Sequence, residues 1–307
     1  MPILEVNDLS ISFDPHAGSY RRRAHRAVAD LNLSVNEREV VAVVGASGSG
    51  KSLLAHAILG ILPAHATMTG SIHYDGEPLT PARQAALRGK ELALVPQSVT
   101  FLDPLMRVGK QVRTSVGAGD PVERQRNVFA RYGLAPDTEK LFPAQLSGGM
   151  ARRVLVSTAV VSGARVIVAD EPTPGLDAAA LAQTLATFRE LADSGAAVLL
   201  ITHDIEAALD IADRIAVFYA GTTVEVAPVA DFAGDGSKLR HPYTKALWRA
   251  LPRNDFIPLP GAQPTPDEWL PGCLFEPRCA MATAACAVRP PRKRDVRGGS
   301  VWCDHAT

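Results

Sequence analysis

Three short runs of consecutive apolar residues, rich in valine and isoleucine, mark the framework of the chain. They are residues 40–44, 166–169 and 196–201. Uninterrupted apolar runs of this length are typical of strands that are buried on both faces of a parallel sheet. Residues 53–59, directly after the first run, have the pattern of a helix that stops at Gly60. Strands that alternate with helices predict an α/β fold.

Runs in which apolar and polar residues alternate occur mainly in the N-terminal part of the chain. They are residues 3–6, 9–13, 31–35 and 71–74. Because the side chains of a strand point to opposite faces in turn, each run predicts a separate strand with one buried face. Together they predict an antiparallel β-subdomain beside the α/β core.

Helical and loop patterns replace the strand patterns over about residues 98–160. Helices are expected near 108–112 and 122–131. A strand and a hairpin over residues 214–226 then close the core. We therefore expect one large domain, residues 1–230, that contains an inserted helical subdomain.

The composition of the chain changes past residue 230. A short helix is expected at His241–Trp248, and the proline-rich residues 251–271 indicate an extended connector. All cysteines of the chain follow this connector. They are Cys273, Cys279, Cys286 and Cys303. Residues 231–307 are expected to form a small Cys-rich C-terminal extension.

The clustering of these four cysteines predicts a metal site. Disulfides are not expected in a reducing cytosol, so four thiolates are left to hold Zn²⁺ or a [4Fe-4S] cluster. The spacing matches neither a C-x2-C zinc knuckle nor a standard ferredoxin run, so the choice between zinc and iron–sulfur stays open. Free thiols in a loop-rich tail are the alternative.

The 307-residue chain carries 32 Lys and Arg residues and 32 Asp and Glu residues, so its formal charge is balanced. This balance argues against a general nucleic-acid or anionic-membrane footprint. The basic cluster of residues 21–26 is interpreted as a solvated loop, with phosphate or lipid-surface contact as the alternative. No apolar run approaches the roughly 20 residues that cross a bilayer, and no secretory signal opens the chain. We expect a cytosolic protein that reaches the membrane through partners.

A glycine-rich segment joins the first apolar run to the helix after it. It consists of Gly45, Ala46, Ser47, Gly48, Ser49, Gly50, Lys51 and Ser52, which fits the phosphate-loop pattern G-x-x-x-x-G-K-[ST]. Glycines let backbone N–H groups turn inward around phosphates at a helix N-terminus. Lys51 is placed to reach the β- and γ-phosphates of ATP, and the Ser52 hydroxyl to bind Mg²⁺. A flexible Gly/Ser turn is the alternative, which the flanking strand and helix disfavour.

The second apolar run ends in two carboxylates, Asp170 and Glu171. Asp170, at the strand end, is expected to hold the Mg²⁺ shell. Glu171, one residue further out, can face a water molecule that attacks the γ-phosphate. The alternative for Glu171 is a turn residue before Pro172.

Four further features follow in a fixed order along the chain. They are Gln97, Leu146-Ser147-Gly148-Gly149, Asp177 and His203. With the phosphate loop and the two carboxylates, this order resembles the ATP-binding subunit of an ABC transporter over residues 1–230. The resemblance implies a P-loop NTPase cassette with a RecA-like core, an antiparallel β-subdomain and a helical subdomain.

The resemblance also implies how the subunit works. The residues Ser147, Gly148 and Gly149 would clamp the γ-phosphate held by a partner subunit, so that two ATP molecules lie between two subunits. The chemistry agrees, because Ser-Gly-Gly at the start of an apolar helix offers N–H donors and a positive dipole end to an anion. Asp177 matches the loop that contacts the other subunit, although Pro174-Gly175 departs from the small or hydroxylated residues common there.

Two single polar residues take their roles from the same resemblance. His203 would contact the γ-phosphate and orient the attacking water; a surface histidine is the alternative. Gln97 would join Ser52 and Asp170 around Mg²⁺ and report the nucleotide state to the membrane partner.

Adenine needs an aromatic surface on which to stack. Phe13, at the end of the second N-terminal strand, and Tyr20, in the loop that follows, are ranked equally. The alternative is a core ring for Phe13 and an exposed ring for Tyr20.

The C-terminal residues narrow the resemblance. His241–Leu247, the proline-rich connector and Gly272–Cys279 resemble the extension of ATPase subunits in the oligopeptide, dipeptide and nickel importer family. Met150 resembles the D-type of the two ATPase paralogues in such systems. This implies a heterodimer with a sister ATPase on two permease subunits, fed by a solute-binding protein, at the cytoplasmic face of the inner membrane. Within this family, residues 60–63 and 98–106 resemble the nickel or metal-chelate members.

The predicted function is therefore ATP hydrolysis that powers import of peptides or of nickel or metal-chelate complexes. An ABC exporter is the main alternative, and the peptide-type extension argues against it. A DNA-repair ATPase would carry a long heptad segment between the phosphate loop and residue 147, and a translation-associated ABC protein normally carries two phosphate loops. The sequence has neither feature, and no nucleic-acid partner is expected.

Overall fold

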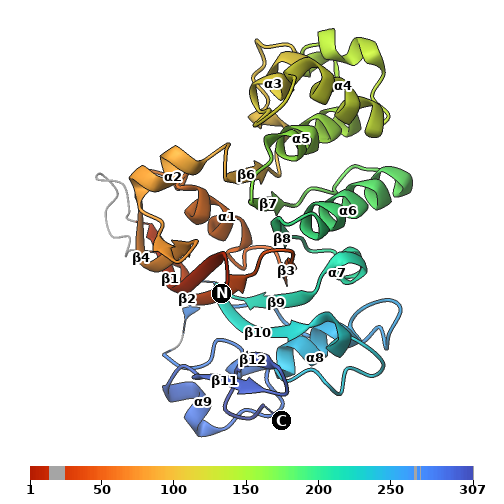
Figure 1. The fold of residues 1–307 in the computed structure, drawn as a ribbon. Coiled ribbons are helices and arrows are strands. Elements are labelled where there is room, and N and C mark those ends of the chain that lie inside the picture. Colours follow the sequence, from red (N-terminus) through yellow and green to blue (C-terminus); the bar gives the residue numbers. More distant parts are fainter. Residues whose placement is uncertain (14–24, 266–267, 270, 307) are drawn as a thin grey trace.

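The computed structural model describes residues 1–13, 25–265, 268–269 and 271–306, and within them the centre of the fold is an eight-stranded sheet (Figure 1). From one edge to the other, its strands are β11 (Lys293–Val296), β12 (Gly299–Trp302), β10 (Thr222–Pro228), β9 (Arg214–Tyr219), β3 (Val40–Gly45), β8 (Ala197–Ile201), β7 (Val166–Asp170) and β6 (Leu92–Val95). The strands from β9 to β6 run parallel, whereas β10, β12 and β11 continue the sheet with antiparallel pairing.

The parallel strands are buried on both faces, because successive side chains enter two different cores. In β3, Val40, Ala42 and Val44 belong to one core, and Val41 and Val43 belong to the other. All five side chains are fully shielded from solvent. This arrangement explains why the strands have unbroken apolar sequences, and it confirms the predicted α/β core.

Helices lie on both faces of this sheet (Figure 1). One core includes α1 (Lys51–Leu59) and a second, smaller sheet, and α2 (Pro81–Leu87) packs beside α1. The other core includes four helices, which are α5 (Gly148–Ser162), α6 (Ala178–Asp193), α7 (Ile205–Ile211) and α8 (Pro242–Arg249). As predicted, α1 stops at Gly60, whose φ of 62° is left-handed and whose N–H bonds to the last turn. Among the described residues, no helix is both long and apolar enough to span a membrane.

The smaller sheet confirms the antiparallel β-subdomain but corrects its strands. Its order is β2 (His25–Val35), β1 (Leu4–Phe13), β4 (Ala66–Tyr74) and β5 (Glu77–Pro78). The prediction of separate strands over 3–6 and 9–13 is wrong, because both belong to β1. Asp8 has a left-handed φ of 49°, and the pairing of β1 with both neighbours shifts beside it. This bulge interrupts the alternation of side chains, which in the sequence looks like a strand end.

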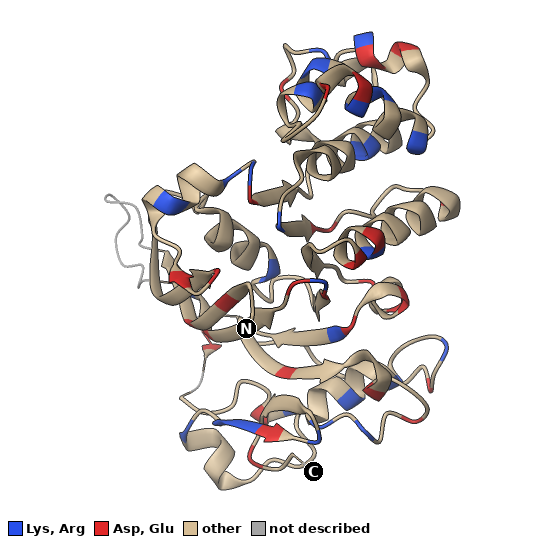
Figure 2. Cartoon of the chain, in the orientation of Figure 1, with Lys and Arg blue, Asp and Glu red and all other residues tan. Residues whose placement is uncertain are grey.

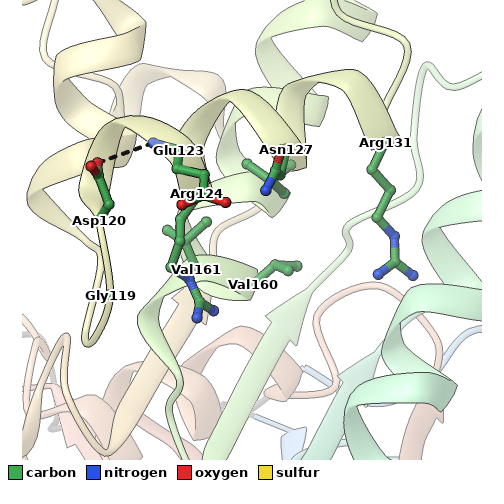
Figure 3. Close-up of a pocket in the computed structure, with 9 residues that line it drawn as sticks. Gly119, Asp120, Glu123, Arg124, Asn127, Arg131, Val160 and Val161 are labelled. Atoms are coloured by element: carbon green, nitrogen blue, oxygen red, sulfur yellow. Dashed lines mark hydrogen bonds between the residues drawn. The ribbon is translucent and has the colours of Figure 1, made fainter.

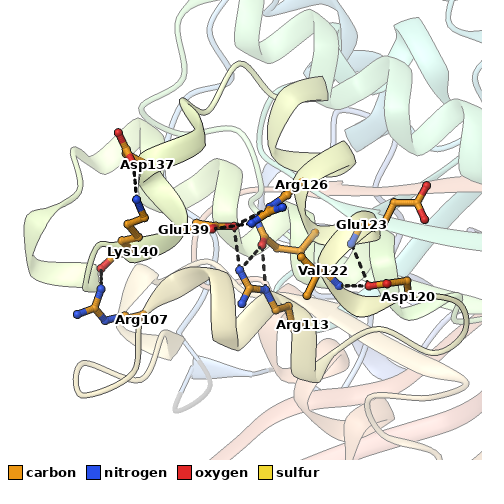
Figure 4. Close-up of polar contacts among 10 residues, drawn as sticks. Arg107, Arg113, Asp120, Val122, Glu123, Arg126, Asp137, Glu139 and Lys140 are labelled. Carbon is orange, nitrogen blue, oxygen red and sulfur yellow. Dashed lines mark hydrogen bonds and ion pairs between the residues drawn. The ribbon is translucent and has the colours of Figure 1, made fainter.

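The predicted helices of the middle segment are present as α3 (Val108–Thr114) and α4 (Pro121–Arg131), which stand with α5 at one end of the molecule (Figure 1). Glu139 joins them by ion pairs to Arg113 and Arg126, and Asp120 caps α4 (Figure 4). Positive and negative side chains are interspersed over this part (Figure 2). Further helical turns among the described residues are η1 (Val99–Phe101), η2 (Pro136–Lys140), η3 (Pro143–Gln145), η4 (Val229–Asp231), η6 (Glu276–Arg278) and α9 (Ala284–Val288).

The C-terminal residues are attached to the large sheet through a hairpin and a buried ion pair. The β11–β12 hairpin extends the sheet, with Val301 opposite Glu225 of β10. Glu225 and Arg240 are 0% and 1% exposed, and their charged atoms lie 3.2 Å apart. Glu225 also accepts the backbone N–H groups of Arg240 and His241 at 3.0 and 2.8 Å, while Arg240 Nε donates to the carbonyl of Val296 at 2.6 Å. These contacts fix the hairpin to the cassette.

We expect Glu225→Ala to lower the free energy of unfolding by about 2–5 kcal/mol, because it leaves two buried N–H groups without their acceptor and leaves Arg240 with Asp231, at 2.8 Å, as its remaining carboxylate. Asp137→Ala, which breaks the exposed pair of Asp137 with Lys140, is the control and should change little. Urea unfolding of both variants measures the difference. Equal, small losses would show that the buried pair does not hold the C-terminal hairpin.

Candidate nucleotide-binding site

A cavity of about 750 Å³ lies at the carboxyl ends of the parallel strands. Its lining residues are His25, Ala27, Ser47, Gly48, Gly50, Lys51, Ser52, Leu53, Gln97, Glu171, Pro174 and His203. The carboxyl edge of a parallel sheet is where α/β folds bind ligands, because loops from several strands meet there. The structure thus brings together the phosphate loop, Gln97, Glu171 and His203, which the sequence could only place in order.

The phosphate loop connects β3 to α1 and requires glycine at several points. A Cβ atom on Gly45 would lie 2.3 Å from the carbonyl oxygen of Phe218 in β9, so the loop passes directly over the neighbouring strand. Gly48 and Gly50 have left-handed φ values of 78° and 87°, and Gly50 is the N-cap of α1. The loop therefore presents backbone groups at the N-terminus of α1, where the helix dipole favours an anion.

Lys51 is a buried cation that the loop holds through carbonyl groups. Its side chain is only 7% exposed, and Nζ donates to the carbonyl oxygens of Gly45 and Ala46 at 2.7 and 3.1 Å. Burial lowers the pKa of Lys51, and the nearby carboxylates of Glu171 and Asp170 oppose this effect. A phosphate group in the cavity would give this cation a charged partner.

Asp170 and Ser52 supply oxygen ligands suited to magnesium. Ser52 Oγ donates to Asp170 Oδ1 at 3.1 Å, so a hydroxyl and a carboxylate already meet beside the phosphate loop. Burial raises the pKa of Asp170, and the hydrogen bond from Ser52 opposes the rise. Mg²⁺ prefers such oxygen donors and binds through one or two carboxylates together with phosphates. The residues present therefore fit the ion.

Glu171 and His203 form a pair beside them, with 2.7 Å between Glu171 Oε2 and His203 Nδ1. Glu171 has a left-handed φ of 48°, which is unusual for a residue with a side chain and is typical of functional sites. Its backbone N–H bonds to the carbonyl of Ile201 at 2.8 Å. Arg152, on α5, donates to the carbonyls of Pro96 and Glu171 at 3.0 and 3.4 Å. Sequence reasoning missed Arg152, whose only signal was its place on the helix after Ser-Gly-Gly.

Phe13, one of the two candidates for stacking on adenine, lies away from the cavity lining. The Phe13 ring packs 5.4 Å from the ring of His65, and Phe13 does not line the cavity. Tyr20 lies outside the described residues. His25 and Ala27, at the start of β2, line the cavity instead and were missed, because nothing in an alternating strand pattern distinguishes them. The adenine contact remains a prediction.

The residues Ser147, Gly148 and Gly149 lie outside the lining of this cavity. Ser147 caps α5 by accepting the N–H of Met150 at 3.3 Å, and Asp177 caps α6 by accepting the N–H of Ala180 at 2.9 Å. A Cβ atom on Gly149 would lie 3.7 Å from the carbonyl oxygen of Gly175, so the start of α5 and the loop before Asp177 are neighbours.

The four cysteines line one small cavity of about 20 Å³, together with His241 and His305. None of them is in a disulfide. Burial raises the pKa of Cys273 to about 11 and also raises the pKa of Cys279 and Cys303. As placed, however, no three His, Cys, Asp or Glu side chains of the described part of the chain are grouped closely enough to hold a metal ion.

Another cavity, of about 460 Å³, lies against α4 and the end of α5 (Figure 3). Charged residues of both signs line it, including Asp120, Arg124 and Arg131, beside the apolar Val160 and Val161. It contains none of the residues that the sequence analysis assigned to a site.

A phosphate loop on a parallel sheet, with a magnesium-type aspartate and a glutamate–histidine pair facing it, defines a P-loop nucleotide-binding cassette. Two family models match the chain: ABC transporter, over residues 28–174, and the C-terminal region of oligopeptide/dipeptide transporters, over residues 224–286. The chain is 34% identical to the dipeptide transport ATP-binding protein DppD of Escherichia coli K12, over 95% of this chain and 92% of that protein. It belongs to the family of ATP-binding subunits of oligopeptide and dipeptide ABC transporters.

Other relatives agree with this assignment. The chain is 33% identical to a putative peptide import ATP-binding protein of Brucella abortus (97% of this chain, 93% of the relative). It is 36% identical to the oligopeptide transport ATP-binding protein OppD of Mycobacterium tuberculosis, over 96% of this chain but only 50% of that protein. The chain therefore spans about half the length of the mycobacterial relatives that it matches.

Solved structures confirm the ABC cassette fold. An ATP-binding subunit of an ABC transporter superposes with a TM-score of 0.62 at 26% identity, covering 75% of this chain and 91% of that one. A bacterial ABC transporter cassette solved as a dimer gives a TM-score of 0.66 at 24% identity, covering 74% and 98%; this likeness concerns the fold alone.

Asp170→Asn should stabilise the nucleotide-free protein at pH 7 by about 0.5–2 kcal/mol, because it replaces a carboxylate whose burial disfavours the charged form. The pKa of Asp170 is raised in the folded state, so its ionised form costs stability above the ordinary carboxyl range. The gain should therefore shrink as the pH falls toward about 4.

Urea unfolding at pH 7 and near pH 5 measures this effect. Asp137→Asn is the matched control, because Lys140 lowers the pKa of Asp137 and its replacement should not stabilise the protein. A less stable Asp170→Asn variant at pH 7 would contradict the assignment of a desolvated carboxylate.

Proposed function

We propose that this protein hydrolyses ATP and thereby powers an importer of peptides. The observation that supports this most directly is the single cavity in which Lys51, Gln97, Glu171 and His203 surround the phosphate loop. A buried cation, a helix N-terminus and a glutamate–histidine pair on one cavity suit phosphoryl transfer to water, which depends on positioning and charge stabilisation.

In this proposal different residues bind the phosphates, accept the proton of water and hold Mg²⁺. The N–H groups of the phosphate loop and Lys51 hold the phosphates, and Glu171 accepts the proton of the attacking water. His203 holds one carboxylate oxygen of Glu171 at 2.7 Å, so the other oxygen can face the water. Ser52, Gln97 and Asp170 would hold Mg²⁺, which when bound offsets the negative charge of the β- and γ-phosphates.

We propose further that the working unit is a dimer. Ser147, Gly148 and Gly149 do not line the cavity of their own chain, yet they begin a 15-residue helix whose N-terminus can receive an anion. A partner subunit would therefore supply these donors to each cavity. By family resemblance the partner is a sister ATPase, and both would dock on two permease subunits at the cytoplasmic face of the inner membrane, fed by a solute-binding protein.

The cargo is proposed from the names of the relatives. They are described as oligopeptide, dipeptide and peptide import proteins, which supports peptides over nickel or metal chelates. The same names, together with the match of the C-terminal region, support import over export.

We propose that the four cysteines bind Zn²⁺ or an iron–sulfur cluster. Their shared cavity and free thiols support this, although the side chains would have to rotate inward to form a ligand set. A metal would also stabilise the thiolate forms that burial disfavours in the metal-free chain.

Glu171→Gln should reduce ATP hydrolysis by about 10²–10⁴-fold while ATP still binds and holds the closed dimer, because the amide cannot accept the proton of water. Lys51→Ala should abolish tight ATP binding, because the phosphates lose their buried cation. Phosphate release and equilibrium ATP binding measure the two effects. Glu77→Gln, at an exposed position, is the control. Normal hydrolysis by Glu171→Gln would reject Glu171 as the base.

Elemental analysis of protein purified without oxygen should find about one zinc or about four iron atoms per chain. Cys279→Ser should lose the metal, whereas Ala282→Ser, at an exposed position between Cys279 and Cys286, should keep it. A metal-free protein with an ordered C-terminal segment would contradict the proposal.

A further inference from the structure

The proline-rich connector, residues 251–271, touches the phosphate loop directly. Gln263 Nε2 donates to the carbonyl oxygen of Ser47 at 2.6 Å, although the two residues lie 216 positions apart. The Gln263 Oε1 atom accepts the N–H of Ala220, in the β9–β10 turn, at 3.3 Å. The side-chain amide of Gln263 therefore connects the phosphate loop to the β9–β10 turn, using both its donor and its acceptor.

This contact determines how a peptide group of the loop is oriented. In a trans peptide the C=O of one residue and the N–H of the next point in opposite directions. Because Gln263 holds the Ser47 carbonyl on the connector side, the N–H of Gly48 is aimed away from the connector. Gly48 itself lines the nucleotide cavity. Inward N–H groups of this kind are what a phosphate loop offers to phosphates.

A second residue of the C-terminal region supports the same loop. Tyr243, on α8, is 4% exposed, and burial raises its pKa to about 12 while a hydrogen bond from the Ala46 backbone opposes the rise. Its ring packs 5.4 Å from the ring of Phe275, which lies between Cys273 and Cys279. The start of α8 therefore lies near the phosphate loop.

The connector is itself held by the cysteine-bearing segment. Arg278, next to Cys279, donates to the carbonyls of Leu259, Pro260 and Gly261 at 3.3, 2.9 and 3.0 Å. It also donates to the Tyr219 hydroxyl at 3.1 Å. One guanidinium thus holds three consecutive carbonyls, of residues 259–261, shortly before Gln263 in the chain. Contacts therefore run without a break from the cysteine cavity to the phosphate loop.

We propose that Gln263 is a positioning residue for nucleotide binding, through which the C-terminal segment sets the conformation of the phosphate loop. This inference rests on the proposed ATP site. Gln263 does not touch the reacting atoms; it raises the affinity for the β- and γ-phosphates by holding one peptide group in the binding orientation. The role deepens the proposed function, since it makes the C-terminal segment part of the nucleotide site.

The test is a Gln263→Met variant of the full chain, which keeps the length of the side chain but removes both hydrogen bonds. ATP and ADP affinities, measured by calorimetry, should each fall about three- to tenfold, the equivalent of one lost hydrogen bond. The KM for ATP should rise by a similar factor with kcat nearly unchanged, and amide hydrogen exchange at residues 47–49 should become faster. Gln263→Glu keeps the acceptor but not the donor, so it should also bind ATP more weakly.

Thr265→Val is the matched control. It breaks the bond of Thr265 to Glu268 within the same connector and does not touch the loop, so it should leave affinity and exchange unchanged. Unchanged ATP affinity in Gln263→Met, an equal loss in Thr265→Val, or a fall in kcat at constant KM would each overturn the proposal. A wild-type chain that binds no ATP would instead overturn the proposed function itself.

Discussion

The phosphate loop depends on the close contact between Gly45 and the backbone of Phe218. A side chain at position 45 would collide with that carbonyl, so glycine alone lets β3 pass straight into a loop above its neighbour β9. The carboxyl ends of β7 and β8 reach the same edge of the sheet, which delivers Glu171 and His203 to the loop. The site therefore depends on the parallel pairing of these strands and on a glycine at position 45.

Several charged side chains lie at this edge of the sheet, and contacts within the chain balance their charges only in part. Lys51 is turned toward backbone carbonyls, Asp170 toward a hydroxyl, and Glu171 keeps a left-handed backbone. Burial works against the charged form of both Lys51 and Asp170. A phosphate group and a divalent cation have the charges that these residues lack, so the arrangement favours ligand binding at the expense of stability in the empty state.

The C-terminal residues are structurally part of the cassette. Their hairpin continues the large sheet, and the fully buried Glu225–Arg240 pair holds it in place. Such a pair contributes less to net stability than to defining one arrangement, because the cost of removing both charges from water offsets much of their attraction. The connector then passes the phosphate loop, and Arg278 holds it there.

Short-range features could be read from the sequence. The apolar runs, the phosphate-loop glycines and the Gly60 stop depend on the conformations of a few consecutive residues, so local pattern determines them. The single bulged strand β1, Arg152 beside Glu171, and Gln263 on Ser47 were decided only by the tertiary structure. The last two contacts join residues that are not neighbours in the chain, so they depend on how strands pair and helices pack. The sequence around a single glutamine or arginine does not indicate which residue it will contact. The order of the motifs along the chain thus determined the class of protein and its candidate residues, whereas packing decided which of them share a cavity and what holds that cavity in shape.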